Sequence, residues 1–223
     1  MKIRFIILMI TVSLFLSICL SQNRSEVTRE MIELSEPDVT GNMSLEKALS
    51  QRRSVRQFSD KPVSEKKLSQ LLWAGQGITE KSRGFRTAPS AGALYPLKLF
   101  AVNSKGVFEY IPEGHKMVKR IDRNVKGALA KAALGQSWVK EAALNIIIAG
   151  DEKILATKYG GRAKRYMLLE AGHAAQNILL QATSLDLGSV PVGAFSIRSV
   201  EKLLNLQNDF KPLYIICIGQ DKD

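Results

Sequence analysis

Cysteine is almost absent from this sequence of 223 residues, which has only Cys19 and Cys217. Cys19 falls in an N-terminal stretch typical of a removable signal, so the mature chain would keep a single cysteine. An internal disulfide is then excluded, even for an exported protein. No spacing of cysteine and histidine suggests a metal site, and we expect none. The fold must therefore depend on a hydrophobic core, for which the chain is long enough.

Other common patterns are missing as well. The sequence has no internal repeat, no glycine loop of the Rossmann type and no phosphate-binding P-loop. Segments that look like helices and strands also alternate without the regular rhythm of a doubly wound fold. These absences favour an α+β domain in which any ligand site is built from other segments.

Acidic residues are in short supply: 21 Asp and Glu stand against 32 Lys and Arg, for a formal net charge of +11. Removing Lys2 and Arg4 with a signal would leave +9. The basic residues are scattered and form no tail or helix face, which argues against a nucleic-acid partner. Arg52, Arg53 and Arg56 are the exception and form a candidate phosphate site. The alternative is that they are a solvated run of charge.

Residues 1–21 have the order of a secretory signal, in which basic residues precede the apolar stretch Phe5–Leu20 and small polar residues follow it. Cleavage is expected after Ser21, which predicts an exported protein of the periplasm or cell envelope. The segment Leu16–Cys19 also resembles a lipoprotein box, so a lipid anchor is an alternative, and an uncleaved membrane anchor is a third.

The rest of the chain divides into a polar, flexible linker over 22–42 and one domain over 43–223. Ser44 and Ser64 are expected to cap helices, because serine hydroxyls accept hydrogen bonds from the first turn. The remaining elements follow from apolar periodicity and turn residues. Helices are expected at about 44–51, 64–74, 118–134, 162–186 and 200–204, and strands at about 97–102, 107–111, 143–149, 189–192 and 213–218.

The helix expected over 162–186 organises the domain. Its small residues Ala171, Gly172, Ala174 and Ala175 would let another helix approach closely, either inside the domain or from a second subunit. Polar residues fall in a narrow opposite sector, which could instead face water. The members of this sector are Tyr166, Glu170, His173, Asn177, Gln181 and Ser184.

Three further segments contain the candidate chemistry. They are RRSVR at 52–56, APSAGALYP at 88–96 and GSVPVGAF at 188–195. Together with RxxLLEAGHAAQN in the long helix, and in this order, they resemble the nitroreductase-like flavoprotein family. The longer matches RRSVRQF, PSAGALYP, KYGGRAKRYMLLEAGHAAQN and VPVGAF resemble its SagB-type dehydrogenase branch, which includes the azoline oxidases of peptide maturation. The resemblance covers about residues 43–220.

The resemblance implies a nitroreductase-like fold, with a mixed, mainly antiparallel sheet flanked by helices and the long central helix near a dimer interface. It also implies a homodimer that binds FMN between its subunits. Family members often place further basic residues after the last strand to close over the FMN phosphate. This chain offers only Lys222 there.

Individual residues of the three segments acquire roles through the same resemblance. The arginine segment would contact the FMN phosphate and ribityl chain, the second segment would lie along the isoalloxazine, and the third would lie by its reactive edge. There the backbone N–H of Gly193 would point at the flavin N5 and stabilise negative charge on reduction. The implied contacts are Arg52, Arg53, Ser54 and Arg56, then Ser90, Ala91 and Gly92, then Pro191, Val192 and Gly193.

An adjacent Lys-Tyr pair before the long helix is associated with azoline oxidation in the SagB-type branch, and Lys158-Tyr159 occupies that place here. A shielded lysine beside Arg162 could accept a proton while hydride leaves for the flavin, and Tyr159 could share that proton. The alternative is a surface lysine beside a packing aromatic residue.

The sequence as a whole predicts an FMN-dependent oxidoreductase that works by two-electron, ping-pong hydride transfer. Its ligands would be a heterocycle, a quinone or a nitroaromatic, with NAD(P)H as a possible donor. A flavin-binding or sensor protein without turnover is the alternative of the same fold. A binding module for anionic ligands is a third possibility, which depends on charge alone. An apparent export signal fits poorly with azoline oxidation beside cytosolic cyclisation enzymes.

Overall fold

The structure is a computed structural model in which residues 30–206 and 209–222 are described. The predicted signal, 1–21, lies outside these residues, as does the first part of the predicted linker. For Met31–Glu33 the linker prediction is wrong, because they form strand β1 and pair with a neighbouring strand of the main sheet. The folded domain therefore begins before residue 43.

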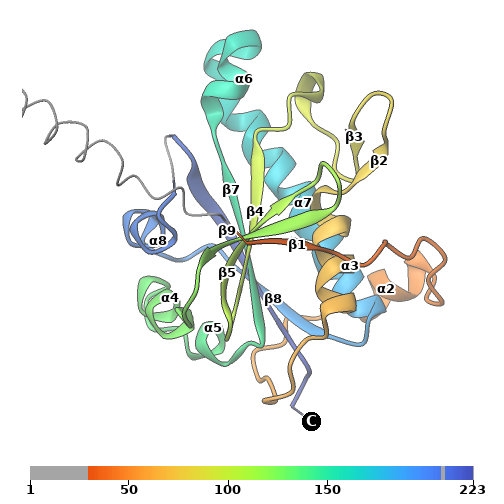
Figure 1. Cartoon of the computed structure of the whole chain (residues 1–223), viewed down its shortest axis with the longest axis vertical. Helices are drawn as coiled ribbons and strands as arrows, with labels where there is room; N and C mark the ends of the chain where they lie inside the picture. Colours follow the sequence, from red (N-terminus) through yellow and green to blue (C-terminus); the bar gives the residue numbers. More distant parts are fainter. Residues whose placement is uncertain (1–29, 207–208, 223) are drawn as a thin grey trace, which may run out of the picture.

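A seven-stranded sheet forms the centre of the domain, with the order β1-β6-β5-β4-β7-β9-β8 (Figure 1). Every pairing between its named strands is antiparallel, which agrees with the expected α+β fold. A separate hairpin joins β2 and β3. The remaining strands are β2 (Ile78–Glu80), β3 (Phe85–Arg86), β4 (Leu97–Asn103), β5 (Gly106–Ile111), β6 (Lys116–Ile121), β7 (Leu144–Gly150), β8 (Gly188–Val192) and β9 (Lys211–Gly219).

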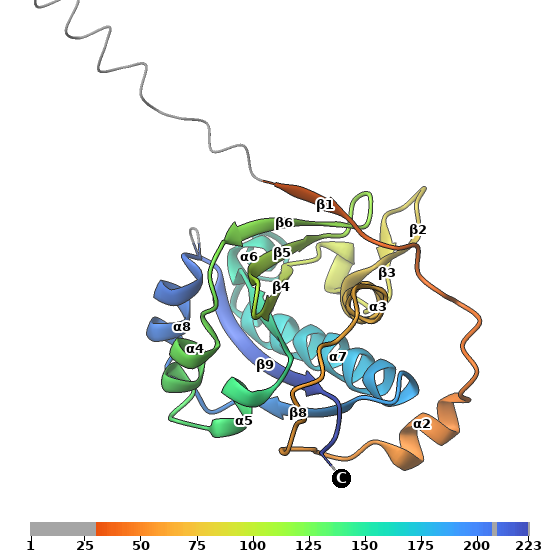
Figure 2. The same cartoon turned by 60° about the horizontal axis from the view of Figure 1, so that its bottom comes forward.

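The two faces of the sheet bury alternate residues of the same strands, as strand geometry requires. In β7, Ile146 and Ile148 belong to the core on one face, whereas Ile147 and Ala149 belong to the core on the other. The run is apolar on both faces because helices cover both, giving three layers (Figure 2). One outer layer contains α3 (Glu65–Gln76) and α7 (Ala163–Ser184); the other contains α4 (Lys126–Ala132), α5 (Ser137–Glu141) and α8 (Ile197–Leu204).

The serine caps predicted from the sequence are present. Ser44 Oγ accepts a hydrogen bond from Lys47 N at the start of α2 (Leu45–Gln51), and Ser64 Oγ does the same for Lys67 N at the start of α3. These bonds fix the point at which each helix begins. Because α2 ends at Gln51, the segment 52–56 starts directly after its last turn.

The helix expected over 118–134 is wrong in its first half. Lys116–Ile121 form β6, which pairs with β5 on one side and with β1 on the other. The helix α4 begins only after Asn124, whose Oδ1 accepts a hydrogen bond from Lys126 N at 3.0 Å. Pairing with the open edge of β5 thus overrides the local preference of a lysine- and arginine-rich segment for helix.

The alanines of α7 face the interior of their own chain. Ala171, Ala174 and Ala175 are buried in the core that α7 shares with α3 and the sheet. Gly75 allows the close approach of α3, since a Cβ there would lie 3.0 Å from Ile178 Cδ1. Of the two roles considered for the alanines, the role inside the domain is therefore correct, and a subunit contact through Ala175 is not.

Candidate functional site

The arginine segment is attached to one edge of the main sheet. Ser54 forms a parallel bridge with Ser189 of the edge strand β8, and Val55 N donates to Ser189 O at 3.0 Å. At its other end the segment is joined to α2, because Arg52 N donates to Ala48 O at 2.9 Å. The three arginines are thus held beside β8 by contacts of the backbone.

The charges of these arginines are not neutralised by acidic side chains. Among the residues that the structure describes, none of the ion pairs includes Arg52, Arg53 or Arg56. Arg53 donates through Nη1 to the carbonyl oxygens of Ser50 and Arg52 at 2.9 and 2.8 Å, so it is partly engaged. The Arg56 guanidinium carbon lies 5.7 Å from the centroid of the Trp138 ring. Arg52 and Arg56 are therefore the better anion ligands.

The end of the described chain returns to this place. Phe58 pairs with Asp221, and Lys222 N donates to Gln57 O at 3.1 Å. Lys222 is exposed and adjoins the residue after Arg56. The basic residue that follows the last strand thus lies beside the arginine segment, where it can add a further positive charge.

The third predicted segment consists of β8 and the three residues that follow it. Val192 is buried and Pro191 is half-buried, whereas Gly193 is exposed just beyond the strand. A Cβ on Gly193 would meet no atom closer than Tyr214 Cε2, at 3.9 Å. Space beside the Gly193 backbone is therefore open in this chain, as contact with a flat ligand would require.

The second predicted segment is a loop with an unusual backbone. Gly92 has a φ of +63°, in the left-handed region, and so do Ala93 and Tyr95, with φ of 54° and 50°. Ser90 Oγ accepts from Tyr95 N at 2.9 Å, and Arg86 N donates to Tyr95 Oη at 3.1 Å. Ala93 and Tyr95 are thus held in a conformation that is sparsely populated by residues other than glycine, an arrangement common at ligand sites.

Lys158 and Tyr159 lie against this loop. A Cβ on Gly92 would come within 2.8 Å of Tyr159 Oη and 3.1 Å of Lys158 Nζ. The two residues end helix α6 (Glu152–Tyr159), which is not among the helices predicted from the sequence. Lys158 is exposed, and the shielding expected for it is not provided by the described residues of one chain. The structure nevertheless brings the predicted proton-transfer pair to the predicted flavin loop.

The arginine segment and the Gly92 loop are kept apart by α7. The loop adjoins Tyr159, which precedes the first turn of α7, whereas the arginine segment adjoins Ser189, which follows its last turn. At 1.5 Å per residue, the 22 residues of α7 span about 33 Å. The arginine segment and the Ser90–Gly92 loop thus lie toward opposite ends of α7, and no hydrogen bond or ion pair among the described residues joins them.

The polar sector of α7 faces the protein more than water. Asn177 Nδ2 donates to Thr87 O at 3.2 Å, and Gln70 Nε2 donates to Gln181 Oε1 at 3.1 Å. Only His173 of the six sector residues is exposed. The two amides therefore tie α7 to α3 and to the start of the Gly92 loop.

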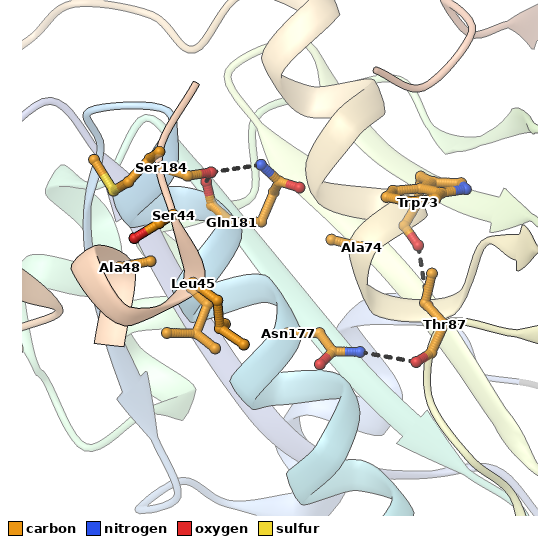
Figure 3. A pocket seen from close by; sticks show the side chains of 11 residues that line it. Ser44, Leu45, Ala48, Trp73, Ala74, Thr87, Asn177, Gln181 and Ser184 are labelled. Atoms are coloured by element: carbon orange, nitrogen blue, oxygen red, sulfur yellow. Dashed lines mark hydrogen bonds between the residues drawn. The ribbon is translucent and has the colours of Figure 1, made fainter. Parts of the chain in front are cut away.

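A pocket of about 330 Å³ opens between α2, α3 and α7 (Figure 3). Asn177 and Gln181 line it together with apolar side chains such as Leu45 and Trp73, and no charged side chain lines it. None of the predicted FMN contacts is among its lining residues. The pocket is thus separate from both groups of predicted site residues.

Glu170 is the residue of the polar sector whose setting the sequence does not predict. Its side chain is 2% exposed, and neither carboxylate oxygen has a hydrogen bond of good geometry within the described residues. Burial raises its pKa to about 7, while the nearby Ser90 hydroxyl, the Arg86 charge and the Gln76 amide oppose the rise. The feature of the sequence that could have indicated this setting is a single carboxylate within the apolar run of the long helix.

The outward face of α7 exposes two leucines in its first half, beside Lys164 and Arg165. Leu168 and Leu169 are 47% and 52% exposed, and they lie next to the exposed Gly172 and His173. Part of this face is a shallow hollow, which is lined by Gly161 and the first two turns of α7. Two adjacent exposed leucines on one helix face are typical of a contact surface.

Among residues 30–206 and 209–222, no three His, Cys, Asp or Glu side chains gather as metal ligands would. Within the same residues, no helix combines the length and the apolar character needed to cross a bilayer.

Comparison with known proteins agrees with this geometry. The chain matches the nitroreductase family over residues 49–220. A protein of Methanocaldococcus jannaschii that is named as a nitroreductase is 40% identical over 198 residues, covering 86% of this chain and 98% of the relative. The FMN reductase (NAD(P)H) of Bacillus subtilis is 26% identical over 191 residues, covering 79% of this chain and 66% of the relative.

The fold has close counterparts among solved structures. A crystal structure from Ralstonia eutropha, described as that of a nitroreductase, superposes with a TM-score of 0.79 at 27% identity and covers 86% of this chain and 90% of its own. The family match, the relatives and the fold all indicate the same family. The chain belongs to the nitroreductase family and is an oxidoreductase.

Proposed function

We propose that this protein is an FMN-dependent oxidoreductase in which two copies of the chain build two active sites. The observation that carries this proposal is the separation of the predicted contacts at opposite ends of α7. A second copy with its α7 antiparallel to the first would bring the arginine segment of one chain to the Gly92 loop of the other. A homodimer then has two equivalent sites, as a two-fold axis requires.

The residues present fit FMN. Arg52 and Arg56 supply two guanidinium groups with no acidic partner among the described residues, as a phosphate ligand needs. Ser54 and Lys222 adjoin them and could add a hydroxyl and an ammonium group. Open backbone at Gly193 suits the edge of a flat ring system, where its N–H would lie by the flavin N5.

When bound, FMN supplies two-electron chemistry, in which a hydride is accepted at N5 from one ligand and passed to the next in a ping-pong cycle. The arginine segment would orient the cofactor from its phosphate end. The Ser90–Gly92 loop of the second copy would cover the isoalloxazine and exclude water from it. NAD(P)H is proposed as one donor, since the Bacillus subtilis relative is named for it.

Lys158 and Tyr159 would transfer the proton in a dehydrogenation of the SagB type. Hydride removal from a heterocycle such as an azoline also releases a proton, and a base must accept it. Contact of both side chains with Gly92 supports this role, because the same loop would flank the flavin. A second subunit over α7 would also shield Lys158, which is exposed in one chain.

The proposed dimer can be tested on the exposed face of α7. Leu169→Glu should give a monomer by sedimentation, since it places a charge in the apolar patch of Leu168 and Leu169. Ile197→Glu on α8 is the matched control, because Ile197 is 50% exposed on the opposite side of the sheet and should leave the dimer intact. A wild type that is monomeric with bound FMN would contradict the shared site.

The cofactor and the activity are tested by one preparation. Purified protein should be yellow, with a flavin spectrum that bleaches under anaerobic NADPH and returns on addition of a quinone. A yellow protein that neither donor nor acceptor changes would favour the flavin-binding alternative without turnover. A colourless protein that takes up no added FMN would refute the proposal.

Export from the cytoplasm remains part of the proposal and depends on the sequence of residues 1–21 alone. Mass spectrometry of the protein from the cell envelope should show a chain that begins near residue 22. Lipid on Cys19 would identify the anchored form, and an intact N-terminus in the cytoplasm would contradict export.

A further inference from the structure

A buried polar cluster lies beneath the Gly92 loop. It contains Glu170 of α7, Gln76 of α3, Arg86 of β3 and Ser90 at the start of the loop. Both oxygens of Glu170, Gln76 Nε2 and Arg86 Nε are inaccessible to water and have no well-formed hydrogen bond among the described residues. Unpaired buried groups are costly and therefore uncommon in folded proteins. Four of them in one cluster indicate a role other than stability.

Glu170 lacks the ion pairs that usually accompany a buried carboxylate. Glu109, whose side chain is 6% exposed, pairs with Lys98 at 2.9 Å and with Arg120 at 3.0 Å. Arg86 is the only charged group shown to act on Glu170, and its guanidinium is shared. Its Nη1 donates to Gln76 Oε1 at 3.0 Å and its Nη2 pairs with Glu113 at 3.2 Å.

Other titratable groups lie on several sides of the cluster. Lys158 and Tyr159 of α6 lie next to Gly92, and the Arg86 guanidinium carbon lies 4.6 Å from the centroid of the Tyr95 ring. Tyr110 of β5 and Glu113 lie on the Arg86 side, where they line one pocket with Arg86 and Gln76. Gln76 is the group that α3 directs at Glu170, and it has no charge. The carboxyl thus has one shared cation to stabilise its ionised form, and its pKa of about 7 lies where solution pH can change its charge.

The cluster is connected to the proposed flavin surface through Ser90. The Ser90 hydroxyl is close to Glu170, and its oxygen also accepts from Tyr95 N at 2.9 Å. If Ser90–Gly92 lies along the isoalloxazine, one residue of the loop separates the carboxyl from the cofactor. A negative charge on the cofactor would then act on Glu170 through the protein interior, where salt screens charges much less than at the surface.

We propose that Glu170 is a positioning residue that takes up a proton when the flavin beside Ser90–Gly92 is reduced. This inference rests on the proposed function. Oxidised flavin takes up two electrons and one proton and becomes an anion. The new negative charge makes an ionised Glu170 less favourable, so its carboxylate takes a second proton from solvent and no covalent bond of the protein changes. Two protons are then bound for each two electrons.

The proton count can be measured directly. The midpoint potential of the bound flavin is followed against pH at and above neutrality for wild type, Glu170→Gln and Glu201→Gln. Wild type should take up close to two protons per electron pair, and Glu170→Gln should take up one, because glutamine has the shape of a protonated glutamate and does not titrate. Glu201 pairs with Lys211 at 2.8 Å on the other side of the sheet, so its variant should match wild type.

A merely structural role of Glu170 would shift the potential of the variant by a constant amount at every pH. Equal proton counts in wild type and Glu170→Gln, both with bound FMN, would overturn the inference and leave the proposed function standing. Failure of folded wild type to bind FMN at all would overturn the proposed function and this inference with it. A count that falls from two to one only in Glu170→Gln supports both.

Discussion

Glu170→Gln should change the way the stability of the protein depends on pH, even without a cofactor. Burial raises the pKa of Glu170 from its ordinary value of 4.5 to about 7. Between these values the folded protein keeps the proton, whereas the unfolded chain has lost it. The free energy of unfolding therefore falls by about 1.4 kcal/mol for each pH unit as pH rises, because the folded state binds more protons. Above the folded pKa no further loss occurs.

The total loss in the free energy of unfolding is set by the width of this pH window. It is about 3 kcal/mol for the single carboxyl. Glutamine stands in for the protonated side chain and removes the titration. Wild type and Glu170→Gln should therefore be about equally stable near pH 4, where Glu170 is protonated in the folded state and mostly protonated in the unfolded chain. Near pH 8 the variant should be more stable by about 3 kcal/mol.

Urea unfolding at a series of pH values measures this difference, with the two proteins compared at each pH. Subtraction cancels the titration of every other group, including His115, whose pKa burial lowers. A constant difference between the two proteins from about pH 4 to about pH 8 would refute the reasoning. It would mean that the Ser90 hydroxyl, the Arg86 charge and the Gln76 amide offset the cost of burying the charge.

Three further predictions concern the cofactor site. Arg52→Ala with Arg56→Ala should weaken FMN binding by about two to four powers of ten, at roughly 1.5–3 kcal/mol for each charge-assisted bond, and ultrafiltration of the folded variant checks it. Lys158→Ala and Tyr159→Phe should each slow dehydrogenation of an accepted heterocycle by about 10²–10⁴-fold and leave flavin reduction by NAD(P)H nearly unchanged in stopped-flow traces. Gly92→Ala should lower the thermal midpoint and displace Tyr159, because the new Cβ would lie 2.8 Å from its Oη. Unchanged FMN binding, an unchanged dehydrogenation rate or an unchanged thermal midpoint would contradict the corresponding assignment.

Local sequence signals predicted many of the elements well. Serines 44 and 64 marked helix starts because a hydroxyl cap is a contact within one turn. Likewise, the apolar run that became β7 showed a buried strand because its residues face two cores. Such signals are contained in a few consecutive residues, so no knowledge of distant segments is needed.

Elements that depend on distant partners were harder to predict. β1 is a strand of only three residues that exists through its pairing with β6, and β6 in turn pairs with β5. Neither has a strong pattern of its own. The helix α6 was missed for a related reason: its one fully buried side chain is Leu155, which gives too little periodicity to reveal a helix.

The candidate site shows the same division between local and distant information. The motifs at 52–56, 88–96 and 188–195 were visible as segments, but the distance between them is set by the length of α7. Sequence order gives no sign that the helix would hold two of these segments at its opposite ends. The contact between Lys158-Tyr159 and Gly92 was also hidden, since it joins residues far apart in the chain.

The small residues of α7 show why composition alone could not identify its outward face. Alanine permits close approach on any side of a helix. Here Ala171, Ala174 and Ala175 are buried against α3 and the sheet. What remains for a second subunit is the face with Leu168 and Leu169, which are larger and half-exposed. A partner would then pack against leucines, and the two halves of each proposed site would meet across that contact. Dimerisation and cofactor binding should therefore fail together when this face is disrupted.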